Sequence, residues 1–472
     1  MPHLGQTFPD SLFSVIPGIL PALDPGFRPL AAGVRNFRRE LARQPRREPF
    51  RIALEQGAGA VSRMELELFP EGAGRDADNL RYAAWVLNFM IWSRGGRRAW
   101  IQGPAGLCAA LAARYRPEGP HAFDARLMGQ AFAGPFEVRV VPLHQLPLAQ
   151  ARPLALGGHL EGCRIGFDLG ASDYKVAAVR DGETVFSAEL PWDPRNQPDP
   201  AYHYGMLNAG LELAAAHLPR VDAIGGSSAG IIVDNRIRVA SLFRAVPAEA
   251  FAEHVEPFFP RLQQAWGVPL EVINDGEVTA LAGALSLGLS GILGIAMGSS
   301  EAAGYLDRRG RLTGWLNELA FAPIDANPEA GTDDWSGSPG IGAAYFSQQG
   351  VDRLARAAGM GLPPELGLPE RLKLVQGRME HGDPAARAVF GSIGVCLGYA
   401  LAWYAEFYEL DHAMILGRVT SGAGGEMILG RAREVLAAEF PELAERMSIF
   451  LPDEQCRRVG QAAAAASLPV IP

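Results

Sequence analysis

The segment FDLGASDYK, Phe167–Lys175, decides the fold of this chain. An apolar strand ends in Asp168, the small-residue turn Gly170-Ala171-Ser172 follows, and Lys175 begins a second apolar strand. Small residues let a backbone approach a bulky anion, because no large side chain stands in the way. An aspartate at such a turn can hold the Mg²⁺ that accompanies a nucleotide phosphate. The segment therefore predicts a phosphate-binding turn, with an ordinary hairpin turn as the alternative.

Length and composition describe an ordinary globular protein with more than one domain. The chain has 472 residues, of which 48% are hydrophobic and 20% are charged, and its formal net charge is −9. A chain of this length exceeds what one core usually supports, so we expect two or three domains. The negative charge gives no sign of a nucleic-acid partner. Arginines clustered between Arg35 and Arg51 are interpreted as a solvated segment.

Cysteine spacing and hydropathy bear on the compartment. The cysteines, Cys108, Cys163, Cys396 and Cys456, are far apart and form no CxxC pair. This spacing argues against a disulfide framework and against a zinc knot. The amino end lacks the basic start of a signal peptide, and no long uninterrupted apolar run predicts a membrane span. We therefore expect a cytoplasmic protein without a membrane partner.

A repeated plan of strands and turns predicts two related lobes. Three consecutive strands are expected over 165–169, 175–180 and 185–190. The last two join at Asp181-Gly182, which is typical of a two-residue hairpin. The second copy of the plan has strands over 292–297 and 304–306 and the start of a third strand over 311–313. An internal repeat of this kind predicts an α/β protein with a cleft between two lobes.

We expect three domains. Residues 1–160 form a small α/β domain of unknown role, 161–275 the first lobe, and 276–472 the second lobe, with a C-terminal helix that could return to the first. Residues 1 to about 45 are rich in proline and are expected to be irregular. The remaining elements of the first domain are strands at 64–68, 99–101 and 136–141 and helices at 79–93 and 106–115.

Three later segments place polar or small residues at strand ends. Strand 270–273 delivers Asn274-Asp275 at its carboxyl end, where ligands of open α/β sheets collect, although Asp275 could simply cap a helix. The turn Gly298-Ser299-Ser300 could cradle phosphate or be a tight hairpin. Residues 414–425, MILGRVTSGAGG, could accept a flat adenosine or be a plain connection between strand and helix.

These four segments, in this order, resemble the phosphate-1, connect, phosphate-2 and adenosine segments of the actin, Hsp70 and sugar kinase superfamily. From Cys163 onward the chain resembles the ROK family of repressors, open reading frames and sugar kinases. Further similar stretches are GGSSAGIIVDNRIRVASLF at 225–243, WLNELAFAPID at 315–325 and LGYALAWYAEFYELDHAMILG at 397–417. The resemblance implies two ribonuclease-H-like lobes around a nucleotide cleft, an additional N-terminal domain, and a possible homodimer.

The resemblance also implies roles for individual residues. Asp275 would match the catalytic base, and Asn274 and Glu318 would bind the sugar. Asp168 would act on Mg²⁺ as well as on phosphate. The phosphate and nucleotide would be held by Asp168, Gly170, Ser172, Lys175, Gly298, Ser299, Ser300 and Gly417. ATP and Mg²⁺ are therefore the expected cofactors, and a sugar or sugar-like polyol is the expected substrate.

Several residues depart from the family pattern and weaken this assignment. Phe321 replaces the family's histidine, and residues 322–334 contain no Cys or His, so no structural zinc is expected. Glu301 follows the phosphate turn, where a carboxylate about 4 Å from a phosphate oxygen would cost roughly 4 kcal/mol at an effective dielectric near 20. Glu301 must point away, reach phosphate through Mg²⁺, or mark a site that does not use ATP in the usual way. Arg244 either binds an acidic or phosphorylated substrate or is a surface residue.

Three functions are compatible with this pattern. The first is an ATP-dependent kinase of a sugar or polyol, favoured by the presence of both Asp168 and Asp275. The second is a catalytically weak sugar- or nucleotide-binding regulatory protein of the same fold, favoured by Glu301 and Phe321. The third, a ROK-type repressor, ranks lowest because the amino end shows no clear helix-turn-helix.

Overall fold

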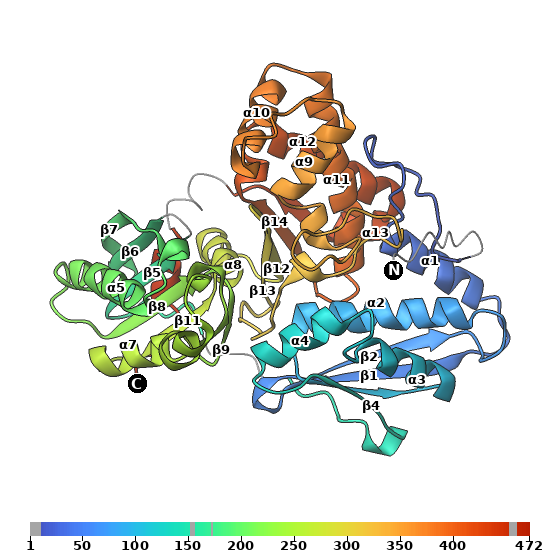
Figure 1. The fold of residues 1–472 in the computed structure, drawn as a ribbon, viewed down its shortest axis with the longest axis horizontal. Helices are drawn as coiled ribbons and strands as arrows, with labels where there is room; N and C mark the ends of the chain where they lie inside the picture. The colour runs from blue at the N-terminus through green and yellow to red at the C-terminus, as the bar shows by residue number, and fades with distance from the viewer. Residues whose placement is uncertain (1–10, 152–155, 171–172, 453–459) are drawn as a thin grey trace.

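The structure is a computed structural model that describes residues 11–151, 156–170, 173–452 and 460–472. It shows an N-terminal α/β domain below a large second lobe, with the first lobe beside both (Figure 1). The two lobes have the expected fold class, with a mixed sheet in each.

The N-terminal domain is built on a four-stranded sheet in the order β2-β1-β3-β4. β1 pairs with β2 and with β3 in antiparallel fashion, and β3 pairs with β4 in parallel. The strands are β1 (Glu48–Glu55), β2 (Val61–Leu68), β3 (Arg98–Gln102) and β4 (Glu137–Val140), and the helices are α2 (Asp76–Arg94), α3 (Ala105–Arg114) and α4 (Ala122–Ala131). α2 is buried along most of its length because it lies between this sheet and the second lobe.

The expectation of an irregular segment up to about residue 45 is wrong, because α1 (Leu30–Leu41) lies within it. Leu30, Val34, Phe37 and Leu41 recur at helical spacing and are buried. α1 packs on α11 (Pro384–Tyr404) of the second lobe. Most arginines of this region are exposed, as the sequence predicts, and they also pair with acids: Arg38 with Glu406, for example.

The first lobe has a five-stranded sheet in the order β11-β8-β5-β6-β7. β5, β6 and β7 form an antiparallel meander, and β8 and β11 continue it in parallel with β5. The strands are β5 (Cys163–Leu169), β6 (Asp173–Arg180), β7 (Glu183–Pro191), β8 (Ala223–Ser228) and β11 (Leu270–Asn274). A small hairpin, β9 (Ile231–Val233) and β10 (Arg236–Val239), and helices α5 (Pro200–Ala215), α6 (Ala248–Ala250) and α7 (Phe258–Trp266) complete the lobe. The predicted turn at Asp181-Gly182 is confirmed, and both residues have positive φ.

The second lobe follows α8 (Asp275–Leu287) and has the sheet order β13-β12-β14-β15. Its strands are β12 (Ile292–Met297), β13 (Glu301–Leu306), β14 (His412–Leu416) and β15 (Ser448–Phe450). The expected third strand at 311–313 is reduced to an isolated bridge between Leu306 and Leu312. The chain leaves the sheet there because its next backbone N–H groups, at 316–318, donate to the carbonyl groups of 94, 93 and 92 at the end of α2.

Helices cover the second lobe. They are α9 (Gln348–Ala357), α10 (Leu368–Glu380), α11 (Pro384–Tyr404), α12 (Ala423–Glu439) and α13 (Pro441–Arg446). Among the described residues, α11 is long and apolar enough to cross a membrane by length and composition. Most of its apolar window, 78%, is buried inside the protein.

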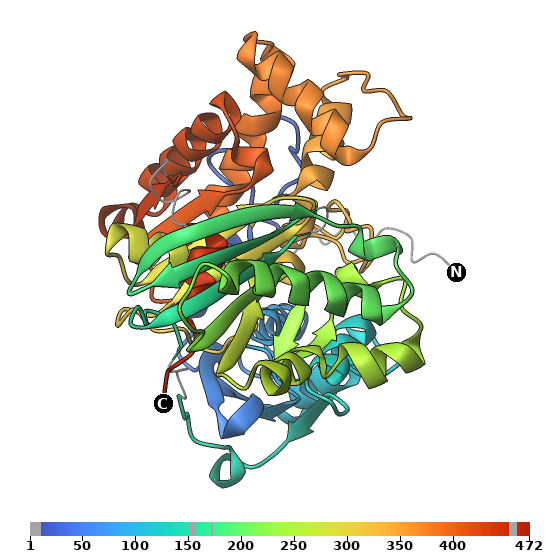
Figure 2. The same ribbon diagram turned by 90° about the vertical axis from the view of Figure 1, so that its left-hand side faces the viewer.

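The C-terminal helix α15 (Gln461–Ala466) packs on the sheet of the first lobe (Figure 2), whereas β15, the strand that precedes it in sequence, belongs to the sheet of the second lobe. Glycines on β5 and β8 make room for it. A Cβ on Gly166 would lie 1.7 Å from the carbonyl oxygen of Ala462, and one on Gly225 would lie equally close to that of Ala465. No side chain fits at either position.

Candidate functional site

The strand end at Asp168 brings three polar residues of the first lobe together. Asp168 is buried at the end of β5, where it pairs in register with Lys175 on β6 and Ser227 on β8. Burial raises the pKa of Asp168, and the Ser227 hydroxyl and the Lys175 ammonium only partly offset it. A buried carboxylate without a full cationic partner is an oxygen donor suited to Mg²⁺.

Asp275 stands at the junction of the two lobes. β11 ends at Asn274, and α8 begins at once with Asp275. The Asn274 side chain caps α8 by accepting from the Gly276 N–H at 2.8 Å, and its amide donates to the Gly230 carbonyl at 2.8 Å. These two hydrogen bonds fix the end of β11. Asn274 therefore supplies the cap of α8, and the cap does not need the carboxylate of Asp275.

Close packing of small residues aligns α8 with the second lobe. A Cβ on Gly276 would lie 2.4 Å from the carbonyl oxygen of Ala303, and one on Gly304 would lie 2.2 Å from that of Gly276. The start of α8 therefore rests directly on β13, where larger side chains would separate them.

Glu318 reaches the same place from the second lobe. It follows Asn317, which has φ of +52° and is buried, with its side-chain oxygen accepting from the Tyr408 hydroxyl at 3.0 Å. The Glu318 N–H donates to the Trp92 carbonyl at 2.9 Å. The end of α2, in the N-terminal domain, thus positions the glutamate that the resemblance assigns to the sugar.

The carboxyl groups here form an electrostatically linked series. Burial raises the pKa of Asp275 to about 6, with a further contribution from Asp168. Burial and then Asp275 raise the pKa of Glu318 to about 8. Glu277, on the first turn of α8, has its pKa raised to about 8 by burial and by Glu318. At neutral pH these pKa values leave Asp275 mainly charged and Glu277 and Glu318 mainly protonated.

Glu301 points away from the phosphate turn. Its side chain is only 3% exposed and packs against Gly342, where a Cβ would lie 2.0 Å from a Glu301 carboxyl oxygen. Burial raises the pKa of Glu301 to about 8, and the Tyr404 hydroxyl nearby offsets this only in part. Of the three alternatives for Glu301, the structure shows the first, in which the side chain points away from the phosphate turn.

The phosphate-2 turn itself is open. Ser299 and Ser300 are exposed, and the Gly298 N–H donates to the Ser300 carbonyl at 2.9 Å. Gly417 has φ of +98°, and a Cβ there would lie 2.5 Å from the Met297 carbonyl oxygen, so only glycine fits beside this turn. Exposed hydroxyls beside a bare backbone are compatible with phosphate binding.

The phosphate-1 turn is described only at its edges. The Gly170 N–H donates to the Asp173 carbonyl at 3.0 Å, and the Gly170 carbonyl accepts from the Trp192 indole N–H at 2.9 Å. The Lys175 Nζ lies 3.6 Å from an Asp173 carboxyl oxygen. Ser172 lies outside the described residues. The expectation for this turn therefore rests on Asp168 and Lys175.

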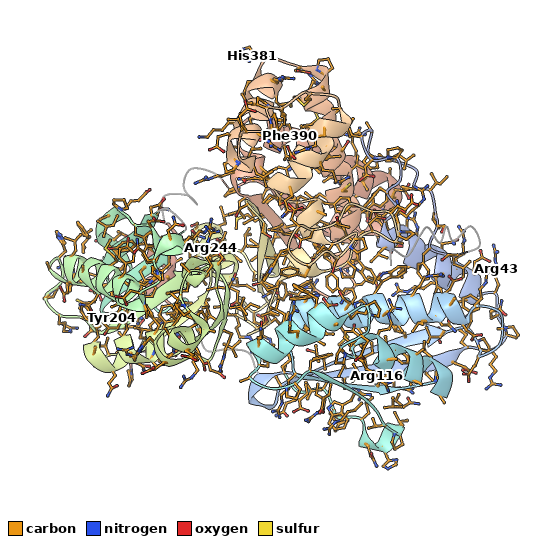
Figure 3. The ribbon with its side chains drawn as sticks, in the orientation of Figure 1. Arg43, Arg116, Tyr204, Arg244, His381 and Phe390 are labelled. Atoms are coloured by element: carbon orange, nitrogen blue, oxygen red, sulfur yellow. The ribbon has the colours of Figure 1, made fainter. Side chains whose placement is uncertain are left out.

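Two further residues stand apart from the carboxyl series. Arg244 is exposed and donates to the Arg195 carbonyl at 3.4 Å, at the edge of the first lobe toward the second in the view of Figure 3. Glu380 caps the start of α12 by accepting from the Ala423 N–H at 3.0 Å. This carboxylate lies beside the loop that was expected to accept adenosine, and sequence reasoning did not single it out.

Glu277 was also missed. The signal was present, since a second acid follows Asp275 by two residues at the start of an otherwise apolar helix. Sequence alone does not reveal that it is 7% exposed and that its Oε1 has no hydrogen-bond partner among the described residues.

Aromatic side chains surround Phe321, which stands where the resemblance implies a histidine. The Phe321 ring is tilted against that of Trp92 with centroids 4.5 Å apart, and its centroid lies 5.3 Å from that of Trp335 and 5.8 Å from that of Phe123. Within the described ranges, no group of three or more His, Cys, Asp or Glu side chains is arranged to hold a metal ion. These rings form an apolar cluster between the second lobe and the N-terminal domain, which supplies Trp92 and Phe123.

We predict that the purified protein contains less than about 0.1 zinc per chain and that chelator leaves its melting temperature unchanged. The reason is that thiolate and imidazole ligands are missing around Phe321. Elemental analysis before and after dialysis against EDTA measures both quantities. One zinc per chain, lost together with several degrees of melting temperature, would contradict this interpretation.

The two lobes share their fold with solved structures of ROK proteins. A ROK hexokinase from Thermus thermophilus superimposes with a TM-score of 0.52 at 18% identity, over 64% of this chain and 96% of that chain. A ROK family transcriptional regulator, a homologue of the E. coli MLC protein, gives 0.50 at 19% identity, over 66% and 79%. At these identities the likeness establishes the fold. No protein-family model and no curated protein sequence matches the chain.

Proposed function

We propose that the protein transfers a phosphoryl group from Mg-ATP to a hydroxyl of a sugar or polyol, with Asp275 as the general base. The observation that supports this most is the position of Asp275 at a strand end, facing Glu318 of the other lobe. A pKa raised to about 6 also makes this carboxylate a stronger base than an ordinary aspartate.

Each residue of the site has a task in this reaction. Asp275 accepts the hydroxyl proton as the oxygen attacks the γ-phosphate. Glu318, protonated at neutral pH, donates a hydrogen bond to the sugar and orients it. Mg²⁺ at Asp168, held directly or through water, would neutralise phosphate charge, and Lys175 and the N–H groups of the Gly298 turn would hold the phosphates.

The carboxyl series favours an uncharged substrate. Asp168 and Asp275 already place negative charge at the proposed transfer site, and an anionic substrate would add like-charge repulsion. Protonated Glu318 can both donate to and accept from a hydroxyl. We therefore propose a neutral sugar or polyol rather than the acidic substrate that Arg244 suggested.

The proposal predicts a bell-shaped pH dependence of kcat/KM. Activity should fall about tenfold per pH unit below about pH 6, because Asp275 must be deprotonated to act as the base. It should fall again above about pH 8, because Glu318 then loses the proton that it donates. Initial rates between pH 5 and 9.5 measure this, and Glu318→Gln should lose only the alkaline limb. An alkaline limb unchanged in that variant would remove Glu318 from the substrate site.

The deciding experiment is an ATP-coupled phosphorylation screen over neutral sugars and polyols with matched sugar acids. Turnover of at least one neutral compound, at a rate well above that of its acid counterpart, is expected. A wild type inert on every compound would refute the kinase proposal.

One observation favours the second function, a regulatory protein that binds without turnover. The Glu380 carboxylate occupies the N-terminus of α12, so a nucleotide at this loop would have to displace it. Thermal melting with millimolar Mg-ATP tests the point on wild type and on Glu380→Gln. A nucleotide shift seen only in the variant would support regulation through Glu380, whereas equal shifts would exclude it.

A further inference from the structure

A cavity of about 1000 Å³ lies where all three domains meet. Its wall includes Gln56 and Arg94 from the N-terminal domain, Asn235 from the first lobe, Glu277 from α8, and Thr313 and Trp315 from the second lobe. Asp168, Asp275 and Glu318 are not among the lining residues, and Glu277 is the member of the carboxyl series that reaches the wall, so this cavity adjoins the proposed transfer site without coinciding with it. Its volume suits a small-molecule ligand.

Three side chains of this wall carry buried polar atoms without a hydrogen-bond partner among the described residues. They are Arg94 Nη1, Glu277 Oε1 and Thr313 Oγ1, from three different elements of the chain. Buried polar groups are nearly always paired, and an unpaired one costs free energy. Three such groups around one cavity indicate a polar ligand that completes them.

Arg94 decides the charge of that ligand. Its guanidinium is 8% exposed and stacks on Trp315 at 3.3 Å and on Tyr408 at 4.9 Å. Nη2 donates to the Phe407 carbonyl, and no described carboxylate forms an ion pair with this side chain. A buried positive charge without a counter-ion is costly, so an anionic group on a ligand would be strongly favoured here.

The acidic side chains that line the cavity do not repel an anionic ligand at Arg94. Asp307 pairs with Arg311 at 2.7 Å, and Glu271 accepts from the Asn235 amide at 2.9 Å. Asp234 and Glu409 are exposed to solvent. Glu277 is protonated at neutral pH, because burial and Glu318 raise its pKa to about 8.

We propose that this cavity binds a polyhydroxylated small molecule with one anionic group, a sugar phosphate or a sugar acid, with its anion at Arg94 and its hydroxyls at Glu277 and Thr313. The inference goes beyond phosphoryl transfer and does not require it, because binding is measured without nucleotide. It also gives the N-terminal domain a role, since Arg94 and Gln56 come from that domain.

Calorimetric titration of the full chain tests the proposal. The probes are glucose 6-phosphate, glucuronate, glucose and inorganic phosphate. We expect one of the two sugar anions to bind at least tenfold more tightly than both glucose and inorganic phosphate, and the stronger of the two identifies the anionic group. If neither sugar anion binds below about 1 mM, the proposal is overturned.

Substitutions separate this cavity from the transfer site. Arg94→Met keeps the apolar stem and should weaken binding about 10- to 100-fold, without lowering the melting temperature, because it removes an uncompensated charge. Arg94→Lys keeps the charge and should retain part of the binding, and Thr313→Val should weaken it a few-fold. Asp275→Asn, in the transfer site, should leave it unchanged. Binding that survives Arg94→Met but is lost in Asp275→Asn would place the anion in the transfer site and refute the proposal.

Discussion

Replacing Asp275 with asparagine is expected to lower kcat by about a hundredfold or more while leaving the fold intact. The amide has the shape of the carboxyl group but cannot accept the proton of an attacking hydroxyl. Its oxygen can keep the contact that Asp275 makes with the Gly276 N–H at 3.0 Å. The cap of α8 is supplied by Asn274, so the free energy of unfolding should change by about 1 kcal/mol or less.

A matched control lies on β11, the strand that leads to Asp275. Glu271→Gln makes the same carboxyl-to-amide change four residues earlier, at a side chain that bonds to Asn235 rather than facing Glu318. It should keep kcat within about twofold of the wild type. Coupled-assay kinetics and urea unfolding of both variants are the measurements. An Asp275→Asn protein that stays fully active would remove Asp275 as the base.

Glu301→Gln is expected to stabilise the protein at alkaline pH and to have little effect near pH 4.5. In the folded protein the pKa of Glu301 is raised to about 8 from its ordinary value of 4.5. Between these values the folded state holds a proton that the unfolded state has released, so the wild type loses about 1.4 kcal/mol of stability per pH unit as the pH rises. Glutamine does not titrate, so the advantage of the variant should grow with pH across this window.

Urea unfolding at pH 5, 6.5 and 8 measures this difference. Glu183→Gln, at an exposed position of β7, is the control and should show the same pH dependence as the wild type. Glu277 and Glu318, whose pKa values are also raised, give every variant some pH dependence of the free energy of unfolding. Parallel pH profiles for wild type and Glu301→Gln would show that Glu301 is already ionised, and hence not buried as described.

Local patterns in the sequence were enough to predict many of the strands and the α/β class, although they missed β1, β9, β10 and β15. Asp181-Gly182 predicted its hairpin because a tight turn needs positive φ at both residues. The alternation of strand and helix around Asp275 predicted a parallel strand end, which β11 and α8 form. These features depend on residues close in sequence, and local chemistry is sufficient for them.

Tertiary structure alone decided which partners these elements meet. The direction of Glu301 depends on the pairing of β13 with β12, which turns the side chain into the lobe. The third strand at 311–313 gave way because the backbone beyond it bonds to the end of α2. α15 returned to the first lobe because Gly166 and Gly225 leave space there for its backbone. Each outcome depends on contacts between segments far apart in the chain, and hydrogen-bond competition and close packing, which no local pattern encodes, determine them.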